Sequence, residues 1–125
     1  MLTSRFFWEG IGGLAYAFAK SDGTMSQEEL KTFANAVEER FRKIPTNFPQ
    51  RAESMLQLFE LLQYTPEKAY QEALQRLAQV KEEVRFYRFD ILDTFREVIR
   101  SDGKVHPYEE TFLAQLDRDL ARIAE

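Results

Sequence analysis

The chain contains no cysteine and only one histidine, His106. The lack of cysteine excludes disulfides, zinc–thiolate sites and thiol catalysis, and it is compatible with the cytoplasmic location that we expect. A single histidine leaves no second imidazole for a histidine-based metal site, and it limits the choice of base for a serine nucleophile. Because no cofactor loop or nucleophile is evident either, we expect a protein without enzymatic activity.

Long apolar runs and a concentrated basic face are also missing. The longest apolar stretch covers residues 11–19, whereas roughly 20 residues are needed to cross a bilayer, so we expect no transmembrane segment. The first residues lack a clean signal-peptide cleavage site. The net charge is −4, and the densest bases are too sparse to predict a nucleic-acid partner: Arg40, Arg42, Lys43 and Arg51.

Apolar residues recur at helical spacing along the whole chain, and no segment alternates as a strand does. The expected inward residues form six successive stripes: Phe7, Ile11, Leu14, Phe18; Leu30, Phe33, Ala34, Val37, Phe41; Met55, Leu58, Phe59, Leu62; Tyr70, Leu74, Leu77, Val80, Val84; Phe89, Leu92, Phe95, Ile99; and Phe112 (or Leu113), Leu116, Leu120, Ile123. The sequence therefore predicts an all-α protein, a single compact bundle of about six helices over residues 1–125.

Local signals refine this outline. Gly10, Gly12 and Gly13 weaken the first helix by propensity, so we expect close packing against a neighbour there. Thr65-Pro66 predicts an N-cap followed by the first helical residue of the fourth helix. The boundary between the fourth and fifth helices is expected near residues 84–87.

The tripeptide Ser-Asp-Gly occurs twice, at 21–23 and at 101–103. In both places it follows a predicted helix, which the Asp-Gly pair would end because glycine accepts a positive φ. After the first copy, Ser26 and Glu29 have the spacing of a capping box. After the second, His106 takes the cap position, followed by Pro107 and then Glu109. Ordinary capping chemistry therefore explains two similar helix-turn-helix corners.

The same corners also resemble the second half of a calcium-binding loop. With glycine at loop position 6, an aspartate stands at position 5 and a glutamate at position 12. The four carboxylates in this pattern are Asp22, Glu29, Asp102 and Glu109. Position 3 carries Lys20 or Arg100 instead of an acid, which excludes an independent site in either loop. Two interpretations remain open, namely four capping acids or one cation site shared by two loops that meet.

Segments 20–29 (KSDGTMSQEE) and 100–109 (RSDGKVHPYE) carry a family resemblance. In an all-helical chain they resemble the TerB-like superfamily, which includes tellurite-resistance protein TerB and the N-terminal domain of the co-chaperone DjlA. The resemblance implies a compact helical fold with a pseudo-repeat of two helix-turn-helix corners, a link to metal or stress response, and no established enzymatic activity. It makes the same four acids candidate ligands of a divalent cation such as calcium. His106, Lys20 and Arg100 depart from what a hard cation prefers.

Three functions follow from these patterns. The first is a TerB-like module that binds a divalent cation through paired acidic loops and offers a surface to a protein partner. The second is a metal-free interaction or scaffolding domain that uses aromatic residues lying off the predicted stripes, such as Trp8, Phe86 or Tyr87. The third, an enzyme using the acids for proton transfer, would require a pocket and a carboxylate with a raised pKa.

Overall fold

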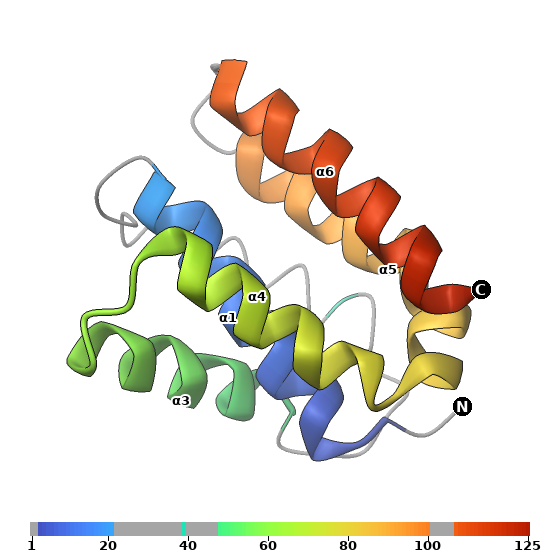
Figure 1. The fold of residues 1–125 in the computed structure, drawn as a ribbon, viewed down its shortest axis with the longest axis horizontal. Helices are drawn as coiled ribbons and strands as arrows, with labels where there is room; N and C mark the ends of the chain where they lie inside the picture. The colour runs from blue at the N-terminus through green and yellow to red at the C-terminus, as the bar shows by residue number, and fades with distance from the viewer. Residues whose placement is uncertain (1–2, 22–38, 40–47, 101–106) are drawn as a thin grey trace.

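The computed structural model describes residues 3–21, 39, 48–100 and 107–125, with the backbone alone for 48–53. These residues form five α-helices and no strand (Figure 1): α1 (Arg5–Ser21), α3 (Phe48–Leu61), α4 (Pro66–Ala78), α5 (Lys81–Arg100) and α6 (Pro107–Ala124). The all-α prediction is confirmed. The expected second helix, with its stripe over residues 30–41, lies outside the described residues, so the count of six helices and the pseudo-repeat remain predictions.

Helix α1 is the central element of the bundle. Helices α3 and α4 pack against it, while α5 and α6 lie side by side as an antiparallel pair (Figure 1). Every residue of α1 from Gly10 to Ala19 is buried, which requires apolar or small side chains on all its faces. The apolar stretch 11–19 is therefore core. In the described part of the chain, no helix combines the length and apolar character needed to cross a membrane.

Two glycines allow α1 to approach its neighbours closely. A Cβ atom built on Gly13 would lie 2.9 Å from the Cβ of Ala73 and 3.1 Å from Cε2 of Phe59. One built on Gly10 would lie 2.6 Å from Cγ of Leu77. Both separations to the α4 side chains are shorter than van der Waals contact, so α4 can occupy this position only because the glycines have no side chain. The prediction of close packing at Gly10 and Gly13 is confirmed.

The helix ends follow the local signals of the sequence. Thr65 caps α4, with its Oγ1 accepting the backbone N–H of Lys68 at 3.1 Å, and Pro66 is the first helical residue. Helix α1 ends at Ser21, directly before Asp22, α5 ends at Arg100, directly before the second Ser-Asp-Gly, and α6 begins at Pro107. The start of α4 is therefore set by capping chemistry, and the other three boundaries lie beside the predicted turn segments.

The predicted inward face of α5 is wrong in part. The helix begins at Lys81, so Val84 belongs to α5 rather than to the preceding helix. Its buried face includes Val84, Tyr87, Ile91 and Phe95, spaced three or four apart. Phe89 lies two positions from both Tyr87 and Ile91, which in a helix places it on the opposite side, and its side chain is 65% exposed.

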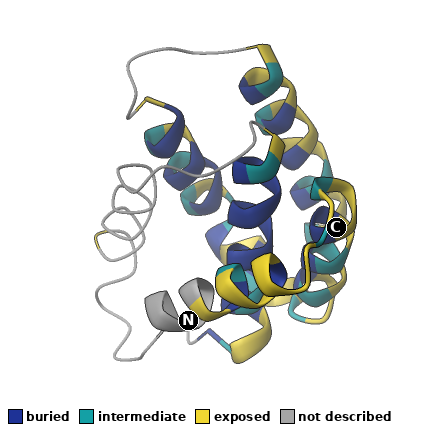
Figure 2. Ribbon diagram, turned by 90° about the vertical axis from the view of Figure 1, so that its left-hand side faces the viewer, coloured by how far each residue is buried: buried dark blue, intermediate teal, exposed yellow. Residues whose placement is uncertain are grey.

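Three further residues differ from the expected pattern. Leu58 and Leu62, expected inward, are 42% and 51% exposed, since Met55 and Phe59 face the core and α3 ends at Leu61. Trp8 is fully buried although it lies off the predicted stripe, and its Nε1 donates to Thr3 Oγ1 at 2.7 Å. Trp8 therefore packs in the core, although Phe6 of the same helix is 41% exposed. Buried residues line the helix faces that meet (dark blue in Figure 2).

Candidate functional site

Of the four predicted cation ligands, the structure describes one. Glu109 lies in the first turn of α6 and is only 2% exposed. Asp22, Glu29 and Asp102 lie outside the described residues. An ionised carboxylate removed from water is unstable unless hydrogen bonds or opposite charges compensate for the lost solvation, and Glu109 does have an interaction partner in the fold. Its burial distinguishes it from a glutamate that merely caps a helix at the surface.

An aromatic cluster joins the end of α1 to the start of α6. The ring of Phe18 lies 5.3 Å from that of Phe112 and 6.5 Å from that of Tyr108, measured between centroids. It also lies 6.2 Å from the ring of Phe95 on α5. Phe18 precedes the first Ser-Asp-Gly by three residues, and Tyr108 directly precedes Glu109. The structure therefore brings the end of α1 beside the helix turn that carries Glu109.

Lys20, the basic residue before the first Ser-Asp-Gly, forms an ion pair with a glutamate of another helix. Lys20 Nζ lies 2.9 Å from Glu60 Oε2 of α3 and donates to Oε1 at 3.1 Å. This hydrogen bond raises the pKa of Lys20, so the lysine remains charged and paired with Glu60. The neighbouring Ser21 hydroxyl donates to the carbonyl of Ala17 at 2.9 Å, as serines near helix ends often do. Among the described residues, both side chains are engaged in these contacts.

Within the described ranges, no three or more His, Asp or Glu side chains gather in a way that could hold a metal ion. The shared site predicted from the sequence would draw three of its four ligands from outside those ranges. It therefore remains a prediction.

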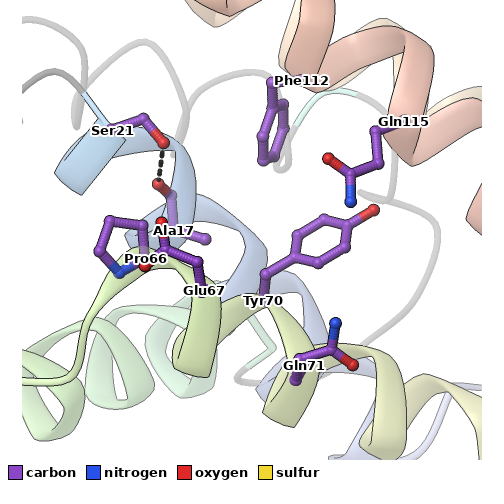
Figure 3. Close-up of a pocket in the computed structure, with 8 residues that line it drawn as sticks. All are labelled: Ala17, Ser21, Pro66, Glu67, Tyr70, Gln71, Phe112 and Gln115. Carbon is purple, nitrogen blue, oxygen red and sulfur yellow. Dashed lines mark hydrogen bonds between the residues drawn. The ribbon is translucent and has the colours of Figure 1, made fainter.

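A pocket of about 160 Å³ lies beside this junction, where α6 meets α1 and α4 (Figure 3). Tyr70, which is 6% exposed, donates its hydroxyl proton to Asp119 Oδ2 at 2.5 Å. Burial, followed by this hydrogen bond to Asp119, raises the pKa of Tyr70. The sequence indicated Tyr70 only as a core residue. Its position on an inward stripe was the one signal that could have indicated this hydrogen bond. A buried tyrosine hydroxyl usually requires a hydrogen-bond partner.

Replacing Tyr70 by phenylalanine is expected to make stability less sensitive to alkali. Tyr70 keeps its proton in the folded protein at a pH where the unfolded chain, with an ordinary tyrosine pKa of 10.0, loses it. Its stabilising contribution is therefore complete below pH 10 and declines above it, by up to about 1.4 kcal/mol per pH unit. Urea unfolding at pH 8, 10 and 11 should show the advantage of the wild type over Tyr70→Phe shrinking as the pH rises.

At pH 8 the variant should be less stable by about 1.5–3 kcal/mol, because it lacks a hydrogen bond to a charged acceptor. Burial also raises the pKa of Tyr16 and Tyr87, so both proteins should lose some stability in alkali. The comparison between the two proteins isolates Tyr70. A stability difference that is the same at pH 8 and pH 11 would contradict the prediction.

Comparison with known protein families identifies the family of this chain. The family model described as tellurite resistance protein TerB matches residues 10–121. Neither the curated proteins nor the solved structures contain a match to this chain. The matched range includes both Ser-Asp-Gly corners and the whole of α3, α4 and α5.

Proposed function

Since the chain belongs to the tellurite resistance protein TerB family, as its sequence resemblance indicated, we propose that it is a non-enzymatic module with a shared site for a divalent cation such as calcium. The proposed ligands are Asp22, Glu29, Asp102 and Glu109. When bound, the cation would tie the two corners together and set the surface that a protein partner contacts. A cytoplasmic role in metal or stress response completes the proposal.

The observation that carries this proposal is the contact between the end of α1 and the start of α6. A shared site requires the two corners to meet, and the packing of Phe18 against Tyr108 and Phe112 supports such a meeting. The burial of Glu109 adds a carboxylate held inside the fold at this junction. Lys20 and Arg100 are basic residues at a loop position where a calcium loop has an acid. The ion pair of Lys20 with Glu60 neutralises one of these two charges.

The donor set favours a hard cation. Calcium and magnesium bind carboxylate and carbonyl oxygens, whereas structural zinc sites are built mainly from cysteine and histidine. The chain has no cysteine and a single histidine. The residues present therefore fit calcium or magnesium better than zinc.

Titration with calcium, magnesium and zinc, read as thermal stability, tests the proposal. A cation that binds only the folded protein stabilises it by about 2.7 kcal/mol at a hundredfold excess over its Kd, which raises the unfolding midpoint by about 10 °C in a domain of this size. Asp22→Asn/Asp102→Asn should remove the response. Asp93→Asn/Asp117→Asn changes the net charge equally at two positions on α5 and α6 and should retain it. Equal responses from wild type and the first double variant would refute the site.

A second pair of substitutions separates ligands from caps. Glu29→Gln/Glu109→Gln preserves capping, because glutamine serves in a capping box as well as glutamate does, but it removes two ligand charges. The cation proposal expects the response to weaken at least tenfold, measured against the variant's own stability without metal, because removing the charge of the buried Glu109 also changes that stability. If the response is unchanged, the two glutamates are not cation ligands.

A metal-free interaction domain is the alternative, and exposed apolar side chains favour it. Leu58, Leu61 and Leu62 are exposed at the end of α3, and Phe86 and Phe89 are exposed on α5. Trp8 and Tyr87, named from the sequence as display residues, are buried and cannot serve in this way. This alternative expects the same unfolding midpoint with and without each of the three cations.

A further inference from the structure

The pocket between α1, α4 and α6 is too small for a typical cofactor. Pockets for drug-sized ligands enclose roughly 300–1,000 Å³, and an apolar cavity of about 150 Å³ accepts benzene. At about 160 Å³, this pocket has room for a single side chain or a ligand of similar size.

One part of the lining is apolar and aromatic. Pro66, the ring of Tyr70 and the ring of Phe112 contribute to it, from α4 and α6 (Figure 3). The two rings meet edge to face, with centroids 6.0 Å apart and planes at 73°. This arrangement provides carbon surface for an alkyl stem and ring faces of the kind that attract a cation.

The polar part of the lining contains one carboxylate and two amides. Glu67 contributes the carboxylate, and Gln71 and Gln115 contribute amide groups that can both accept and donate hydrogen bonds. The hydroxyl proton of Tyr70 is engaged by Asp119, so the Tyr70 oxygen has lone pairs available for a further donor. A positively charged hydrogen-bond donor would suit the Glu67 carboxylate best.

The electrostatics also favour a cation. Among the described residues that line the pocket, Glu67 is the only one with a formal charge, and none is basic. Two nearby lysines are engaged elsewhere: Lys68 lies over the ring of Tyr64, with Nζ 4.4 Å from the centroid, and Lys20 pairs with Glu60. The positive charge of Arg118 lowers the pKa of Tyr70, so this arginine lies near enough to offset part of the negative potential at the pocket. Arg118 does not line the pocket itself.

We propose that this pocket binds a primary ammonium group at the end of a short alkyl stem, as found in a lysine side chain of a partner protein or in a small free amine. The stem packs on Pro66 and Phe112. The ammonium group donates to Glu67, on the side of the pocket where Pro66 lies. The proposal is independent of the cation site, since it uses none of those four acids and no metal.

Titration of the ¹⁵N-labelled full chain with n-butylammonium chloride, followed by NMR at pH 7 in the presence of a chelator, tests the proposal. The expected result is saturable shifts of the amides of Glu67, Gln71 and Gln115 with a Kd on the order of millimolar, as suits so small a ligand. n-Butanol, which has the stem without the charge, should bind at least tenfold more weakly. Butyrate should show no saturable binding. Equal binding of butanol and butylammonium would overturn the proposal.

Three charge variants assign the effect to the pocket. Glu67→Gln should weaken binding of butylammonium about tenfold, and Arg118→Gln should strengthen it several-fold. Asp117→Asn is the matched control, because it makes the same charge change as Glu67→Gln at an exposed position two residues from Gln115, on the other side of α6. If Asp117→Asn weakens binding as much as Glu67→Gln does, the attraction is a general charge effect and the pocket proposal is wrong.

A second ligand series distinguishes the two sources of the ammonium group. Tighter binding of the peptide Gly-Lys-Gly than of butylammonium would identify a lysine of a partner protein as the ligand. Equal or weaker binding of the peptide would identify a free amine. Either result leaves the cation proposal untouched, because the chelator keeps divalent cations out of the measurement.

Discussion

Replacing Phe18 by alanine is expected to lower the free energy of unfolding by about 3–5 kcal/mol, the usual loss for a buried phenylalanine. The side chain is 2% exposed, and its ring contacts rings from both α5 and α6. Its removal would leave a cavity where the central helix meets that pair. Because domains of this kind are stable by only about 5–15 kcal/mol, the loss would be a large fraction of the total.

Urea unfolding measures this loss, and Phe89→Ala is its matched control. The same atoms are removed, but Phe89 is 65% exposed, and its described contact is the guanidinium of Arg88, 4.7 Å from the ring centroid. The control should lose no more than about 1 kcal/mol. If Phe18→Ala does not fold, Phe18→Leu should show a smaller loss in the same direction. Equal losses at positions 18 and 89 would mean that the α1–α6 junction does not stabilise the fold.

The sequence predicted the features of this fold that depend on near neighbours in the chain. The ends of α1 and α5 lie beside the two Asp-Gly pairs that predicted them, and α4 and α6 begin at Pro66 and Pro107. Each boundary depends on the backbone preferences of two or three consecutive residues. Such preferences act before any tertiary contact forms, so they can be read without knowledge of the fold.

The spacing of apolar residues predicted the inward face wrongly where one helix has two apolar faces. In α5, the spacing of Phe86 and Phe89 makes a second stripe beside the buried one of Tyr87, Ile91 and Phe95. Which stripe turns inward depends on the neighbouring helices, and no local rule decides it. In α1 the opposite difficulty arises, because residues 10–19 are buried on every side of the helix, which removes the contrast that defines a stripe.

The candidate sites depend still more on tertiary structure. The role of Glu109 at the start of a helix could be read from its spacing after His106 and Pro107, but its burial could not. The approach of Phe18 to Tyr108 joins residues far apart in the chain, and the pocket combines side chains from three helices. A sequence without a covariation signal contains no direct record of such distances.

Replacing Gly13 by valine is expected to destabilise the protein by about 3 kcal/mol, at the upper end of the usual range for overpacking a core. Even the first added carbon would lie 2.9 Å from the Cβ of Ala73, which is fixed to the backbone of α4 and cannot rotate away. Helices α1 and α4 would have to separate, and contacts such as those of Leu77 with α1 would weaken. Urea unfolding of the variant, compared with wild type, measures the loss.

Moving one methyl group from α4 to α1 tests whether the close approach of the two helices causes the loss of stability in Gly13 variants. Gly13→Ala should lose about 1–2 kcal/mol, because the clash with Ala73 outweighs the roughly 1 kcal/mol that alanine gains over glycine in helix propensity. Ala73→Gly removes the opposing methyl, so adding Gly13→Ala to that background should cost little or should stabilise. Additive losses in the double variant would show that the two positions do not compete for the same space. If the double variant instead regains stability, the cost of a side chain at position 13 depends on the side chain at position 73. Gly13 is then required because α1 and α4 lie so close together.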